Sequence, residues 1–147
     1  MMFIPFLSLP RWAFLIVAWD HYNQQRTPLI ALLNRQPLGS KNIIDFLSKL
    51  ANDSSTKGCL LVLSINERDL LESAANRQVK KDFQSLQKLF ELNLKAELKG
   101  SRRDVTPMAL LLCAQIFSIA GMGKLNVTKD QINKSIKLLL SQLFETR

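Results

Sequence analysis

Apolar residues recur along this chain at intervals of three and four, which is the period of an amphipathic α-helix. The first such run follows Pro10 and holds Trp12, Leu15, Ile16, Trp19 and Tyr22. Thr27-Pro28 is typical of an N-cap followed by proline at the first helical position. We therefore expect this helix to kink or restart at Pro28 and to continue through Leu29–Leu33.

A second helix is expected after Arg35–Ser40, a loop by its Pro and Gly, with Ser40 as the cap. Its apolar face consists of Ile43, Ile44, Leu47, Leu50 and Ala51. The next apolar run, KGCLLVLSINE at Lys57–Glu67, is too short for periodicity to separate a buried strand from a buried helix turn. Because the rest of the chain is helical, we interpret Cys59–Leu63 as a short buried helix in the middle of a bundle.

A long helix is predicted from about Ala74 to Leu98, where Gly100 is well placed to end it. Its main apolar stripe is Val79, Phe83, Leu86, Phe90 and Leu94. A second stripe of Leu89, Leu92 and Ala96 predicts contact with the core over a wide arc. The outer face carries Lys80, Lys81, Gln84, Lys88 and Lys95.

The segment Met108–Ala120 is apolar nearly all round, and Thr106-Pro107 is expected to start its helix as cap and first position. Gly121 and Gly123 are expected to end it. A helix without a polar face must be buried on all sides, and a partner subunit is the simplest cover in so small a chain. A membrane span is the rival interpretation, but these thirteen residues are too few to cross a bilayer.

The final helix has the clearest signature, because Thr128 and Gln131 form a capping box. One stripe follows it: Ile132, Ile136, Leu139, Leu140, Leu143 and Phe144. Lys129, Lys134, Lys137 and Gln142 are expected to face outward. These patterns predict an all-α fold, a bundle of five to six helices, with an irregular segment at residues 1–12 and a helical domain at 13–147.

Composition agrees with a single compact domain of 147 residues, and five Gly with five Pro are too few turns for a β-sandwich. The net charge of +8 favours association with polyanions in general. The charge is spread out, however, and the densest clusters, Lys80-Lys81 and Arg102-Arg103, each lie beside an Asp. We therefore favour a solvated surface over a nucleic-acid patch.

Cysteine and histidine usage argues against a metal site and a disulfide framework, since there is one His and no C-x-x-C motif. Cys59 and Cys113 both have apolar neighbours and are expected to be buried and inert. A reducing, cytoplasmic location follows. The apolar N-terminus MMFIPFLSLPRWAFLIVAW lacks the features of a signal peptide, and Pro5, Pro10 and Arg11 interrupt it as a membrane span.

No catalytic constellation is visible in the sequence. His21 has no cysteine nearby and no G-x-S-x-G serine to pair with. There is no phosphate loop and no dinucleotide fingerprint. We expect no enzyme, no cofactor and no metal.

The order of these segments resembles the C-terminal domain of the tetracycline-repressor (TetR/AcrR) family of bacterial transcriptional regulators. KGCLLVLSINE at Lys57–Glu67 is similar to the family's Gly-Cys-Leu-Leu-Val segment ending in Glu. Leu92–Leu125 looks like its helix end, Gly turn, Asp and apolar helix ending in Gly, and DQINKSIKLLLSQLF is similar to its last helix. Ala13–Leu33 is similar to the helix that links the DNA-binding head to the body.

The resemblance implies a helical body that binds a small effector between its middle helices and dimerises through its last two helices as a four-helix bundle. The implied dimer interface comprises Leu110, Ala114, Phe117, Ile132, Ile136, Leu139, Leu140 and Leu143. The alternative is that half of these residues are ordinary core of one subunit. The pocket candidates are Tyr22, Phe46, Phe83, Leu86, Phe90 and Leu112, each of which is also readily explained as core.

One departure from the family is large, because only twelve residues precede Ala13 and they hold no helix-turn-helix. No DNA-binding residue is therefore expected in this chain, and DNA is a partner only if a head is supplied elsewhere. The partners expected are a second copy, or an intact relative in a mixed dimer that blocks operator binding, and an unidentified small effector. Two alternatives stay open: a basic helical module that binds a membrane surface or nucleic acid, and a non-functional truncated remnant.

Overall fold

The computed structural model describes residue 24, residues 27–53 and residues 73–145, which are helical apart from short connections. The helices are α2 (Ser40–Asp53), α4 (Ser73–Glu97), α5 (Val105–Lys124) and α6 (Lys129–Phe144), and residues 27–34 form a helical segment ahead of α2. No strand occurs in these residues, which confirms the predicted all-α class. The segment 1–12, most of the expected first helix and Cys59–Leu63 lie outside the described residues.

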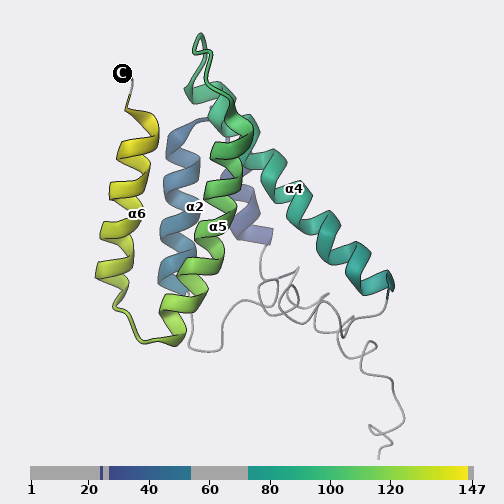
Figure 1. The fold of residues 1–147 in the computed structure, drawn as a ribbon, viewed down its shortest axis with the longest axis vertical. Helices are drawn as coiled ribbons and strands as arrows, with labels where there is room; N and C mark the ends of the chain where they lie inside the picture. The colour runs from purple at the N-terminus through teal and green to yellow at the C-terminus, as the bar shows by residue number, and fades with distance from the viewer. Residues whose placement is uncertain (1–23, 25–26, 54–72, 146–147) are drawn as a thin grey trace, which may run out of the picture.

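Helix α2 lies at the centre of the bundle and packs against α4, α5 and α6. Figure 1 shows α2, α5 and α6 side by side, with α4 running obliquely away from them toward its own N-terminal end. One face of each helix contributes to the hydrophobic core. The fully buried residues of this core include Leu33, Ile43, Leu47, Phe90, Leu94, Leu112, Ile119 and Ile132. The apolar faces predicted for α2 and α6 are confirmed by this burial.

The predicted main stripe of α4 is also confirmed, since Val79, Leu86, Phe90 and Leu94 are buried and Phe83 is half-buried. The second stripe is wrong in part. Leu89 packs against the core, but Leu92 is 42% exposed and Ala96 is exposed. The α4 helix therefore buries a narrower arc than predicted, because α5 and α2 cover only one of its sides.

The ends of α5 differ from the prediction. The N-cap is Asp104, whose side chain accepts a hydrogen bond from Thr106 N at 3.0 Å, so the predicted cap at Thr106 is wrong by two residues. Pro107 then occupies the third helical position. Its missing N–H is not needed there, because the first four backbone N–H groups of a helix have no partner within the helix. Gly121 and Gly123 do not end the helix, which continues to Lys124 because glycine permits helical backbone. Asn126, with φ of 60°, makes the turn instead.

Two buried asparagines join α4 to the loop that precedes α2. The Asn93 side chain donates to the carbonyl oxygens of Leu33 at 2.8 Å and Leu89 at 2.9 Å. Its Oδ1 accepts from Gly39 N at 3.1 Å and from Asn42 Nδ2 at 3.0 Å. Because every polar atom of Asn93 is bonded, its burial is compatible with a stable core, and the loop is held in one position.

Candidate subunit interface

Helix α5 has one face in the core and one face in solvent. Its buried residues are Val105, Met108, Ala109, Leu112, Cys113, Ile116, Ile119 and Ala120. The opposite side leaves two large side chains in solvent, Leu110 at 46% exposure and Leu111 at 50%. No charged residue occurs between Val105 and Gly123, so the solvent side of the helix is uncharged. The core of this subunit covers one side of the helix and leaves the apolar residues of the other side unexplained.

The α5 outer face comprises Leu110, Leu111, Ala114, Phe117, Ser118 and Gly121. All six are exposed except Phe117, which is half-buried. The spacing of Leu110, Ala114, Phe117 and Gly121 is four, three and four residues, which places them in one line along the helix. An unbroken apolar line of this kind on a surface helix marks a contact site for another apolar surface.

The eight residues implied as a dimer interface divide between two environments. Leu110 and Ala114 are exposed on the α5 outer face, together with the half-buried Phe117. Four of the α6 residues, Ile132, Ile136, Leu140 and Leu143, are buried in the core of this chain, and Leu139 is half-buried against it. These four α6 residues are therefore core of this chain and are not available as a surface, whereas Leu110 and Ala114 remain candidates for an interface.

Three exposed leucines were missed by the sequence prediction, and two of them, Leu111 and Leu138, lie on the faces of α5 and α6, whereas Leu125 lies in the connection between these helices. Leu111 is half-exposed on α5, and Leu138 is 63% exposed on α6. Leu138 falls outside the predicted apolar stripe of its helix, and that irregularity was the available signal. It shares one side of α6 with Gln131, Ser135 and Gln142, which are exposed and uncharged. The α6 outer line (Gln131, Ser135, Leu138, Gln142) is therefore a second uncharged surface.

The pocket candidates are packed as core wherever the structure describes them. Phe46, Leu86, Phe90 and Leu112 are buried, and Phe83 is half-buried. Phe46 and Phe90 meet edge to face, with ring centroids 5.4 Å apart and planes at 89°. Tyr22 lies outside the described residues. The structure thus brings four of the six into one cluster, but the cluster is filled by its own side chains.

A hollow of about 510 Å³ lies at the turn between α4 and α5, away from that cluster. Lys95, Lys99, Arg103 and Asp104 supply its charged lining. Arg103 also donates to the carbonyl oxygen of Leu143, which holds the turn against the end of α6. The hollow is open and polar, so it differs from the enclosed apolar pocket expected for a small effector.

Among the described residues, two titratable groups have shifted pKa values, and neither lies in a cluster of catalytic side chains. A hydrogen bond from Arg35 lowers the pKa of Asp45 on the surface of α2. Burial, helped by the negative charge of Glu91, raises the pKa of the Cys113 thiol to about 12, which makes this cysteine inert as expected. Within the described residues, no group of three His, Cys, Asp or Glu side chains could hold a metal ion.

Helix α5 is longer than the thirteen apolar residues Met108–Ala120 on which the sequence prediction was based. It has 20 residues and by length and composition could cross a bilayer, so the prediction that it is too short to do so is wrong. Core helices of soluble bundles have the same length and composition, and the inner face of α5 is packed against α2, α4 and α6. The outer face alone remains to be covered.

Comparison with protein-family models, with curated proteins and with solved structures gives no match for this chain. The class of protein is therefore given by the fold itself, an all-helical bundle with an uncovered apolar face on α5.

Proposed function

We propose that this chain is the effector-binding and dimerisation body of a tetracycline-repressor-like transcriptional regulator, and that it acts as a homodimer. The observation that carries the proposal is the α5 outer face, an apolar line with no charged residue on a helix that its own subunit covers on one side only. Exposing this line to water is unfavourable, at about 25 cal/mol for each Å² of apolar surface. Pairing with the same face of a second copy removes it from water on both subunits.

The two uncharged surfaces support a bundle of four helices across the dimer. The α5 outer face would supply the apolar seam, and the α6 outer line, with Leu138 at its centre, would supply uncharged neighbours. Gly121 faces open space, since a Cβ built at this position meets no atom within 4 Å, and its lack of a side chain would let a second helix approach closely. This arrangement uses the last two helices, as the family resemblance implies.

The other half of the proposal, binding of a small effector between the middle helices, rests on the resemblance alone. The described core around Phe46 and Phe90 is filled, so an effector would have to enter beside it. An intact relative with the same outer face could replace the second copy and form a mixed dimer. DNA binding by the regulator would come from a helix-turn-helix head joined to such a body.

Sedimentation velocity at micromolar concentration tests the dimer. We expect the wild-type chain to sediment as a dimer and Leu110→Asp to dissociate it, with the dimer dissociation constant raised at least about tenfold, because a two-fold interface would bury the new charge twice. Leu92→Asp on α4 is the matched control, since Leu92 is 42% exposed against 46% for Leu110. A wild-type chain that stays monomeric at these concentrations would overturn the proposal.

Ile136→Asp is unsuitable for this test, although the sequence suggests it as an interface position. Ile136 is 2% exposed and lies in the core of its own subunit, so an aspartate there would unfold the chain. Unfolding and dissociation would then be confused in the measurement. Leu110, which is half in solvent already, separates the two effects.

A further inference from the structure

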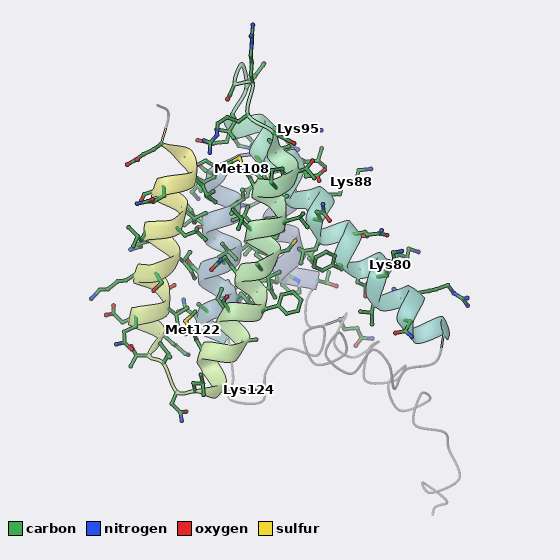
Figure 2. All side chains as sticks on the ribbon, in the orientation of Figure 1. Lys80, Lys88, Lys95, Met108, Met122 and Lys124 are labelled. Atoms are coloured by element: carbon green, nitrogen blue, oxygen red, sulfur yellow. The ribbon has the colours of Figure 1, made fainter. Side chains whose placement is uncertain are left out.

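Helix α4 carries a row of cations along its outward side. Arg77, Lys81, Lys88 and Lys95 are separated by four, seven and seven residues, so they lie in one line on the helix, with Lys80 beside it. These five residues, the α4 basic row, are all exposed. Figure 2 shows Lys80, Lys88 and Lys95 pointing away from the bundle on the same side.

In the part of the chain that the structure describes, the α4 basic row is not paired with acids, whereas some cations on the other helices are. Lys49 pairs with Asp53 at 3.1 Å on α2, and Lys134 pairs with Asp130 at 2.9 Å on α6. Within the described residues, no ion pair holds any member of the α4 row. Five like charges on one helix face repel one another, so the row favours an anionic partner.

The three acids of α4 form no ion pair with the row among the described residues, and each interacts with another group. The negative charge of Glu91 helps to raise the pKa of the buried Cys113 thiol, and its carboxylate accepts a hydrogen bond from Gln87 Nε2 at 3.3 Å. Glu97 accepts from Ser40 N at 3.0 Å, at the beginning of α2. Asp82 accepts from Gln78 Nε2 at 3.0 Å, one turn back along α4.

The geometry points to a linear polyanion, and we propose that the α4 basic row binds the phosphate backbone of duplex nucleic acid without reading its sequence. Lys80 and Lys95 are separated by about 22 Å along the helix axis, at 1.5 Å per residue. Duplex DNA presents one negative charge per about 1.7 Å of its axis with both strands counted, so a length of duplex equal to the row carries about a dozen phosphate charges, of which the near side faces the row. Lys99 and Arg103, which line the hollow beyond Lys95, continue the positive surface past the end of α4.

A lipid surface fits the row less well. A helix that lies on a bilayer inserts an apolar face beside its cations. The apolar face of α4 is already used, since Val79, Leu86, Phe90 and Leu94 are buried. Gln84 and Ser85 lie among the cations in place of large apolar groups, and Leu92 is the one half-exposed leucine near them. A single file of charges also matches a strand of phosphates better than a plane of headgroups.

Two variants with equal net charge test the proposal, by fluorescence anisotropy with a random-sequence duplex DNA. The first replaces Lys80, Lys88 and Lys95 by Gln; the second replaces Lys129, Lys134 and Lys137, which are exposed on α6, by Gln. Each lowers the formal net charge from +8 by three, to +5. Circular dichroism checks that both fold. The affinity for vesicles of phosphatidylserine and phosphatidylcholine is measured in parallel.

We expect the wild-type chain to bind the duplex with log K falling linearly in log salt, at a slope of about −4 to −5 for five phosphate contacts. The α4 variant should lose at least about tenfold in affinity at about 50 mM salt and about three units of that slope. The α6 variant should keep both nearly unchanged. Equal losses in the two variants, no duplex binding by the wild type, or binding to vesicles without binding to DNA would each overturn the proposal. Both variants keep the α5 outer face, so they are compared in the same oligomeric state and the two proposals can fail separately.

Discussion

The carboxylate of Glu97, the last residue of α4, accepts a hydrogen bond from the backbone N–H of Ser40, the first residue of α2, at 3.0 Å. Helix α2 has no acidic residue in its own first turn, so this contact supplies the negative charge that the positive end of the helix favours. A residue 57 positions away thus completes the start of α2.

Replacing Glu97 by alanine should therefore destabilise the fold, by about 0.5–1 kcal/mol, as loss of a helix cap does. The loss is partly offset, because a carboxylate at the end of α4 is unfavourable to the dipole of α4 itself. Urea denaturation measures the difference. Glu145→Ala is the control, since Glu145 is exposed like Glu97 and lies at the C-terminal end of α6. A stability unchanged or raised in the Glu97 variant would show that the α4 dipole dominates.

Asn93 should be the most sensitive polar position in the described bundle. Asn93→Leu keeps a similar volume but leaves Gly39 N, Asn42 Nδ2 and the Leu33 carbonyl without their partner. We expect a loss of about 2–4 kcal/mol in the free energy of unfolding, because several buried polar groups lose hydrogen bonds together. Asn52→Ala, which removes an exposed bond to Asn133, should cost less than about 0.5 kcal/mol. Similar losses in both variants would contradict the role given to burial.

The beginning of α5 offers a direct comparison of two candidate caps. Asp104 accepts from Thr106 N at 3.0 Å, whereas the side chain of Thr106 is exposed. Asp104→Ala should therefore cost about 1 kcal/mol, and Thr106→Ala should be close to neutral. Thermal unfolding of the two single variants measures this. If Thr106→Ala were the more destabilising variant, Thr106 would be the N-cap, as the sequence predicted.

Local patterns predicted much of this fold. The capping box of Thr128 and Gln131 forms as predicted, with Gln131 N donating to Thr128 Oγ1 at 3.2 Å. The outward Lys residues of α4 and α6 and the left-handed Gly100, with φ of 86°, also follow from spacing and residue type. Such features depend on residues within one or two turns of each other, so a single sequence contains the information.

Some predictions failed locally, as at the Asp104 cap, but the most important features that were missed depend on distant residues. Nothing near Asn93 in the sequence indicates that a polar residue at that position is buried, since its partners Leu33, Gly39 and Asn42 are more than fifty positions away. The α5 composition indicated a need for cover but could not say which side α2 and α4 would leave open. Leu110 and Ile136 were both candidates for the interface in the sequence. Only the packing shows that Ile136 is buried in the core whereas Leu110 is exposed.

The thiol of Cys113 gives a prediction that depends on pH. It is 1% exposed, and burial together with the charge of Glu91 raises its pKa from 9.0 to about 12. The folded pKa is the higher one, so the stability contributed by the neutral thiol is complete below pH 9.0 and is lost as the pH rises toward about 12. In the unfolded chain the thiol ionises first, which favours unfolding at alkaline pH.

Two measurements check this in a Cys59→Ser background, where Cys113 is the only thiol. A thiol-specific reagent at about pH 8 should react slowly with the folded chain and fully in concentrated guanidinium chloride, because the thiolate is the reactive form. The free energy of unfolding should also fall more steeply above pH 9 in this background than after a further Cys113→Ala change, since the two variants differ only at residue 113. Rapid labelling of the folded chain, or identical alkaline slopes in the two variants, would show that Cys113 is accessible and that its pKa is not raised.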